Sequence, residues 1–195
     1  MQDQITLSRQ ELEFTTQLIE EAFAHSANAF SIFINLSVSI EALKVNEEIK
    51  YFDQMPTGEV YSLASELKGD IKGRCYLNFS QEDANKLFKI CLSENYRNSE
   101  NMRNGILLEL DNILTAAVVT VLSNKLKMSS YAYVPTLTKI DSNKIIEILN
   151  NDWIEDKLVF DFYTKFKIQD YTITSEFIWV LESKFINLIR KHCNA

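Results

Sequence analysis

The segment from about Ser99 to Lys127 constrains the fold of this chain more than any other. It has no proline and a single glycine, Gly105, and is therefore predicted to form one continuous helix. Apolar side chains occupy most of its circumference, which is typical of a helix buried at the centre of a domain.

Two polar side chains, Glu109 and Asn112, interrupt this apolar surface. They are three positions apart and stand on the same face of the helix. At roughly 100° per residue, the bulky side chains lie on the opposite face, and the polar pair shares its face with small residues, namely Gly105, Ala116 and Ser123. The pair is either the solvated edge of an amphipathic helix or a strip that another molecule can approach closely.

Asn112 is followed by 22 residues and then by Pro135. The pattern Glu-x-x-Asn with a proline at this spacing, in the run ELDNILTAAVVTVLSNKL, resembles the signature of the CheC/CheX/FliY family, and the chain is closest in size to CheC. These proteins are chemotaxis phosphatases that act on the phosphorylated response regulator CheY. Members of the family usually carry Asp or Ser four residues before the Glu, where this chain has Gly105. That departure concerns secondary contacts more than the pair itself.

The resemblance implies a role for each residue of the pair. Asn112 would orient the attacking water, and Glu109 would pair with a lysine of the regulator. The chain would be a cytoplasmic hydrolase with one active site and no cofactor of its own, because the Mg²⁺ is expected on the regulator. The catalytic residues expected are Glu109 and Asn112.

Two alternatives to the phosphatase reading remain. The chain could be a binding module without catalysis, which docks on a response regulator or on a CheD-type deamidase. A flagellar switch protein like FliY is disfavoured at this point, because 195 residues leave no space for the additional domain that such a resemblance would require.

The two halves of the sequence follow one plan: a long helix, a strand, a two-stranded hairpin and a closing helix. We predict a single domain over residues 1–195, made of two repeats at about 8–94 and 98–192. In the first repeat Glu21 takes the place of Glu109, but Ala24 stands where Asn112 would be. Alanine cannot hold a water molecule, and only the second repeat is therefore expected to carry a site.

The fold class that follows is mixed α/β (α+β). The resemblance implies a pseudo-twofold domain with a central, mostly antiparallel sheet and two long antiparallel helices packed on one face. The aromatic-rich hairpin near residues 157–182 is interpreted as sheet and core.

Composition and charge limit the partners. A net charge of −7 argues against nucleic-acid binding. Apolar stretches such as AAVVTVL are read as too short or too interrupted to span a bilayer, and the N-terminus has no apolar signal segment. We therefore expect a soluble cytoplasmic protein that binds no membrane, as a monomer or homodimer.

The remaining candidates for chemistry are weaker. Cys75, Cys91 and Cys193 are odd in number and widely spaced, as in a reducing compartment with free thiols. His25 and His192 have no partner at metal-ligand spacing. No metal site and no thiol nucleophile is expected.

Overall fold

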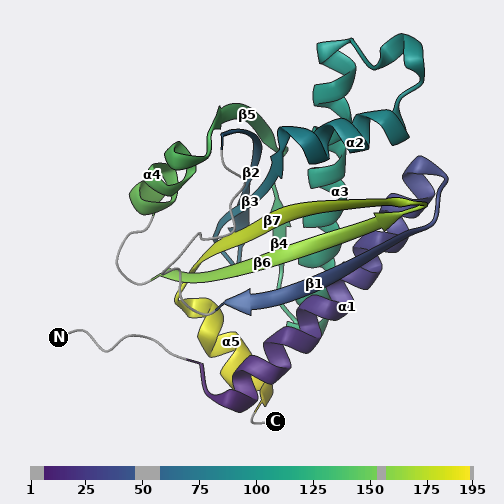
Figure 1. The fold of residues 1–195 in the computed structure, drawn as a ribbon. Coiled ribbons are helices and arrows are strands. Elements are labelled where there is room, and N and C mark those ends of the chain that lie inside the picture. The colour runs from purple at the N-terminus through teal and green to yellow at the C-terminus, as the bar shows by residue number, and fades with distance from the viewer. Residues whose placement is uncertain (1–6, 47–57, 153–156, 194–195) are drawn as a thin grey trace.

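The computed structural model describes residues 7–46, 58–152 and 157–193. The long helix predicted from about Ser99 to Lys127 is present as α3 (Glu100–Leu126). The other helices (Figure 1) are, in chain order, α1 (Arg9–Ile34), α2 (Gln81–Cys91), the short 3₁₀ helix η1 (Glu94–Tyr96), α4 (Ser142–Asp152) and α5 (Lys184–Cys193).

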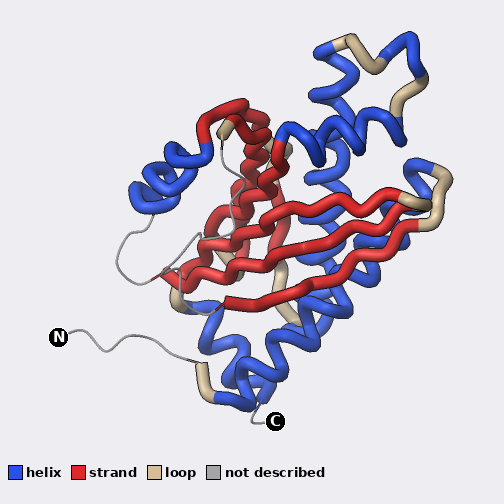
Figure 2. Tube along the Cα trace, viewed as in Figure 1, coloured by secondary structure: helices blue, strands red, loops and turns tan. Residues whose placement is uncertain are grey.

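The strands, red in Figure 2, lie side by side in one sheet. The sheet has seven strands, and every described pairing is antiparallel. They are β1 (Val38–Asn46), β2 (Glu59–Gly69), β3 (Gly73–Ser80), β4 (Ser130–Ala132), β5 (Thr136–Asp141), β6 (Lys157–Ile168) and β7 (Tyr171–Glu182). Strand β5 was not predicted. Its residues have no clear alternation of buried and exposed side chains, because the strand lies at the edge of the sheet beside β2.

The order of the sheet is symmetric about its centre. It reads β1-β6-β7-β3-β2-β4, with β5 also paired to β2. Exchanging β1 with β4, β6 with β2 and β7 with β3 reverses this order and leaves it otherwise unchanged. The hairpins of the two halves therefore meet where β3 pairs with β7.

The two long helices pack together on one face of the sheet (Figure 1). Ser26 of α1 lies 3.4 Å from the carbonyl oxygen of Leu114 of α3, and Glu21 forms an ion pair of 2.9 Å with Lys125. Contacts that advance along α3 while they retreat along α1 require antiparallel helices. The predicted fold class, a pseudo-twofold domain with antiparallel helices on an antiparallel sheet, is confirmed.

The start of α1 is fixed by a capping box at Ser8. The backbone N–H of Glu11 donates to Ser8 Oγ, and the N–H of Ser8 donates to Glu11 Oε2 at 2.7 Å. Glu11 also accepts a hydrogen bond from Arg190 of α5 at 3.0 Å. The bond from the Ser8 backbone, with Arg190 in support, holds the pKa of Glu11 below its ordinary value. One carboxylate thus caps the first helix and ties it to the last.

The core fills the space between the sheet and its helices. Side chains from the aromatic hairpin, including Phe162, Phe177 and Trp179, are almost completely buried there. Phe23 of α1 meets the ring of Phe162 edge to face at 6.0 Å between centroids. The interpretation of the hairpin as sheet and core is confirmed.

Helix α3 is the one described helix that is long and apolar enough to cross a membrane by length and composition, with a mean hydropathy of 1.8 over its most apolar stretch. The prediction that every apolar stretch is too short or too interrupted to span a bilayer is therefore wrong by the length and the composition of α3. Because 56% of that stretch is buried inside the domain, the central helix of a core accounts for its apolar character.

Candidate functional site

The exposed side of α3 carries the predicted site. Leu107, Leu110, Leu114 and Val118 point into the core and are buried. On the other side, the small residues Gly105 and Ala116 are exposed, as is Asn112, whereas Glu109 and Ser123 are partly buried. The polar pair therefore lies in a solvent-facing strip of low bulk.

Both side chains of the pair are available to another molecule. Within the described parts of the chain, neither the Glu109 carboxylate nor the Asn112 carboxamide has a hydrogen bond or ion pair. Further along the strip, the Thr120 hydroxyl donates to the carbonyl oxygen of Ala116 at 2.7 Å and is thereby satisfied within the helix. A carboxamide that both donates and accepts hydrogen bonds thus stands in solvent one turn after a carboxylate.

Gly105 leaves open space at the start of the strip. A Cβ atom built on this residue would meet no heavy atom within 4 Å. The absence of a side chain here is therefore not a steric requirement of the fold.

Pro135 is buried in the connection between β4 and β5, and α3 packs against both strands. The proline at the end of the sequence pattern thus belongs to the segment that supports α3 from the sheet side.

The corresponding position in α1 differs. Ala24 is exposed and offers no polar group, and the Glu21 carboxylate is engaged with Lys125 of α3. A carboxylate held by a lysine of its own chain is less available to a partner than the unpaired carboxylate of Glu109.

A buried acid, Asp111, was missed in the sequence. It lies between Glu109 and Asn112 in the chain but points into the core, where it is 0% exposed. Ser65 of β2 donates to its Oδ2 at 2.6 Å, and its Oδ1 has no partner. Burial raises the pKa of Asp111 to about 7, against the opposing effect of the Ser65 hydrogen bond. An acid on the bulky side of the helix was the signal that could have revealed it.

The other candidate groups are inert or dispersed. Burial raises the pKa of Cys75 well above its ordinary value, with a contribution from the nearby Asp111 carboxylate, and burial raises that of Cys91 to about 11. These thiols therefore stay protonated at neutral pH. His25 is exposed, and the residues that the structure describes contain no group of three side chains able to hold a metal ion.

Comparison with known proteins places the fold. No protein-family model matches the sequence, and no curated protein matches it. Among solved structures the chain is similar to FliY from Thermotoga maritima, with a TM-score of 0.74, 15% identity, and coverage of 97% of this chain and 98% of that one. This chain has the FliY fold.

Two further solved structures share the FliY-like fold. A chain of the CheX–CheY–BeF₃–Mg²⁺ complex from Borrelia burgdorferi matches with a TM-score of 0.54 and 14% identity, covering 85% of this chain and 97% of that one. A chain of the FliG–FliM complex from H. pylori matches with a TM-score of 0.67 and 11% identity, covering 93% and 100%. The predicted resemblance to the CheC/CheX/FliY group is confirmed as a likeness of fold. Because the match to FliY extends over nearly the whole chain, length does not separate this chain from FliY.

Proposed function

We propose that this protein is a phosphatase of a CheY-like response regulator, with α3 as the element that enters the regulator's phosphorylation site. The observation that carries the proposal is the exposed carboxamide of Asn112 on the low-bulk face of α3, one turn after the carboxylate of Glu109, both without a partner among the described residues. The similarity to a structure in which CheX is in complex with CheY supports this choice of partner.

The role of Asn112 is to position a water molecule. A phosphoaspartate is an acyl phosphate, and its hydrolysis forms a bond from a water oxygen to phosphorus and breaks the bond from phosphorus to the aspartate oxygen. Phosphoryl transfer has a loose transition state, so catalysis consists mainly of positioning and electrostatics. The carboxamide oxygen of Asn112 accepts a hydrogen bond from the water and holds the water oxygen in line with the phosphorus. The Mg²⁺ at the phosphoryl group belongs to the regulator.

Glu109 has the role of a docking group. Its carboxylate pairs with a lysine ammonium beside the phosphoryl group and sets the depth of Asn112. An ion pair that closes over a site and loses contact with water is stronger than an exposed one. The free state of Glu109, in contrast to the Lys125-bound state of Glu21, supports this division and a single site per chain.

The competing function is docking without catalysis, on a response regulator or on a CheD-like protein. The similarity to a chain of the FliG–FliM complex favours it, because that structure is an assembly of two proteins. Gly105 stands where the family pattern has Asp or Ser, and this departure from the pattern also favours docking without catalysis.

One experiment separates the two functions. The protein is mixed with a ³²P-labelled CheY-like regulator from the same organism in Mg²⁺ buffer, and the release of inorganic phosphate is followed. We expect release above the regulator's own rate with the wild-type chain and a return to that rate with Asn112→Ala. Binding without faster release would instead establish the docking function, and neither binding nor release would reject both.

A further inference from the structure

Two strongly exposed apolar side chains lie beside the strip of α3 that carries Glu109 and Asn112, one on each side of it. Val134, in the connection between β4 and β5, is 83% exposed, and Ile32, near the end of α1, is 74% exposed. They are the two most exposed large hydrophobic side chains in the described part of the chain. Exposed apolar side chains that gather around one site indicate a surface for another molecule.

The position of Val134 follows from the register of the strands. Between the pairs that β2 makes with β4 and those it makes with β5, β2 supplies two residues and the facing segment supplies three, 133–135. The extra residue makes a bulge centred on Val134, beside Ser65, whose hydroxyl donates to Asp111 of α3. Bulges at a sheet edge often re-aim a side chain next to a functional site. Val134 therefore lies at the level of Asp111 and of its neighbour Asn112.

Asn112 is on the side of α3 where Val134 lies. At roughly 100° per residue, Leu114 is rotated from Asp111 by about 60° in one sense and Asn112 by about 100° in the other. Asp111 points to β2, and Leu114 is on the side of α1, since its carbonyl oxygen lies 3.4 Å from Ser26. Asn112 therefore lies on the side away from α1, which is the edge of the sheet with β4 and β5.

Ile32 lies at the level of Glu109, on the α1 side of the strip. The antiparallel helices α1 and α3 meet at Ser26 and Leu114. Ile32 follows Ser26 by six residues in α1. Glu109 precedes Leu114 by five residues in α3, so at 1.5 Å per residue both lie roughly 8 Å from this contact in the same direction. Phe33, also exposed, is two turns after Ser26 and therefore on the face of α1 that is turned toward α3.

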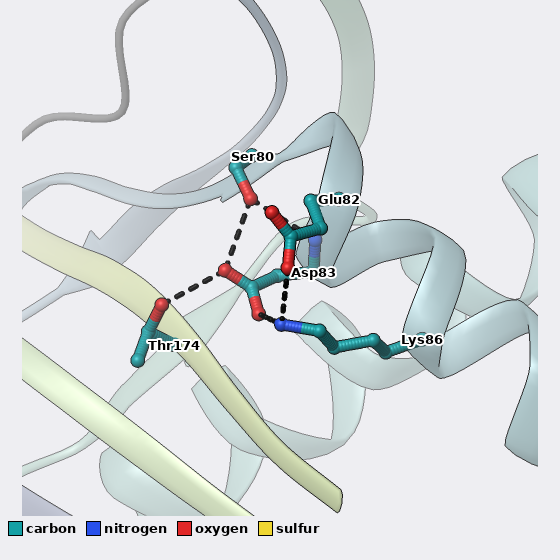
Figure 3. A network of polar contacts seen from close by, with 5 residues as sticks. All are labelled: Ser80, Glu82, Asp83, Lys86 and Thr174. Carbon is teal, nitrogen blue, oxygen red and sulfur yellow. Dashed lines mark hydrogen bonds and ion pairs between the residues drawn. The ribbon is translucent and has the colours of Figure 1, made fainter.

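The chemistry of this surface selects its partner. The carboxylate of Asp83, at the start of α2, shows the contrast, because it pairs with Lys86 at 2.9 Å and accepts a hydrogen bond from Ser80 at 2.9 Å (Figure 3). The Glu109 carboxylate has no such partner among the described residues, and the C-terminal half of α1 beside it contains no lysine or arginine. A partner that brings a cation is therefore favoured over a second copy, in which twofold symmetry would bring two Glu109 carboxylates together.

We propose that two apolar flanks of the strip, Val134 on one side and Ile32 with Phe33 on the other, hold a CheY-like response regulator against α3. The inference rests on the function proposed above and names the surface that recognises the regulator. The regulator presents a lysine to Glu109 and apolar side chains to the two flanks. Covering the flanks removes water from the ion pair of Glu109 and strengthens it, as apolar contacts around the centre of an interface do.

Binding is measured with the CheY-like regulator of the same organism, loaded with BeF₃⁻ and Mg²⁺ as a stable stand-in for phosphoaspartate. Ile32→Ser and Val134→Ser should each weaken binding roughly five- to thirtyfold, because an apolar side chain no longer leaves water on docking. Both losses should persist at high ionic strength, because screening acts on charges. Since both side chains are exposed in the free protein, the melting temperatures should stay within about 3 °C of that of the wild type.

The matched control is Ile148→Ser, which also removes an exposed isoleucine. Ile148 is on α4, and α4 packs through Ile145 into a second core cluster on the face of the sheet opposite α3. This substitution should leave binding unchanged. In the phosphate-release assay, Ile32→Ser and Val134→Ser should raise the regulator concentration needed for half-maximal release and keep the maximal rate, whereas Asn112→Ala should lower the maximal rate.

The outcomes separate this surface from the proposed function. Release that depends on Asn112, with wild-type affinity in either Ile32→Ser or Val134→Ser, would overturn the surface alone. Weakened binding in both variants, with no release by the wild type, would support the surface and reject catalysis. Neither binding nor release by the wild type would overturn both proposals. Equal weakening by Ile148→Ser would reject the surface, as would self-association of the wild type in sedimentation equilibrium that both variants abolish, because the flanks would then belong to a contact between two copies.

Discussion

The hydroxyl of Ser65 on β2 donates a hydrogen bond of 2.6 Å to Oδ2 of Asp111 on α3, entirely out of contact with solvent. This bond joins the sheet to the helix that carries Glu109 and Asn112. The hydrogen bond satisfies only Oδ2 of the carboxyl group, and Oδ1 has no hydrogen-bond partner in the described structure. The contact is therefore sensitive to the ionisation of Asp111.

We predict that the protein loses stability as pH rises from about 4 to about 7. Burial raises the pKa of Asp111 from 3.8 to about 7 in the folded state, so over this range the folded chain binds more protons than the unfolded chain. The free energy of unfolding then falls with rising pH, by up to about 1.4 kcal/mol per unit. Urea denaturation at intervals between pH 4 and 8 measures this slope.

The control for that slope is Asp111→Asn, which keeps the size of the side chain and does not titrate. It should flatten the slope and raise the free energy of unfolding at pH 8 by on the order of 2 kcal/mol. If the variant and the wild type showed the same dependence on pH, Asp111 would not be the group responsible.

Asn112→Ala should reduce phosphate release from the regulator by on the order of 100-fold, because the water loses the group that positions it. Affinity for the phosphorylated regulator should change little. Stopped-flow release and equilibrium binding, measured on the same preparations, check the two halves of this prediction. Similar release rates for variant and wild type would refute the role given to Asn112.

Glu109→Gln should mainly weaken engagement, by roughly three- to thirtyfold, since a closed ion pair becomes a neutral hydrogen bond. At saturating regulator, phosphate release should approach the wild-type rate. The loss should shrink at high ionic strength because screening already weakens the wild-type pair. A lowered maximal rate with unchanged affinity would contradict the docking role.

Glu21→Ala is the matched control in the first half of the chain. It breaks the exposed ion pair with Lys125, which should cost at most about 1 kcal/mol of stability. Phosphate release should not change, because Ala24 provides no water-holding group. Should Glu21→Ala cost as much activity as Asn112→Ala, the prediction of a single site would be wrong.

Gly105→Ala should stabilise the protein by about 0.5–1 kcal/mol. The residue lies in an exposed part of α3, and a Cβ atom there meets nothing within 4 Å. Thermal and urea denaturation measure the gain. Gly105→Asp fits the same space, and comparison of its regulator affinity with that of Gly105→Ala tests whether a carboxylate at this position adds a contact. A loss of stability in Gly105→Ala would show that the glycine has a structural role.

Much of the fold could be predicted because each long element carries a local signal. The uninterrupted apolar run marked α3, and the aromatic-rich segment near residues 157–182 marked the hairpin of β6 and β7. The short edge strand β5 escaped prediction because its pairing with β2 depends on the tertiary structure. The two repeats, at about 8–94 and 98–192, stay a prediction. Ser26 and Leu114, which meet where α1 and α3 pack, are separated by 88 positions, the same separation as Glu21 and Glu109.

The site was less predictable than the fold. A helical projection places Asn112 on the outer face of α3, and the structure finds it exposed there. The same projection places Asp111 among bulky residues, but the hydroxyl of Ser65 that receives it comes from a distant strand.

The pairing of β3 with β7 runs from Gly73–Leu181 to Asn78–Glu176 and joins the two halves through a continuous ladder of backbone hydrogen bonds. This continuous pairing leaves no hinge between the two halves of the sheet. Helix α3 therefore cannot move away from the sheet to meet a binding partner. A partner protein therefore meets a preformed surface on α3, and any conformational change on binding has to occur in the loops of the partner.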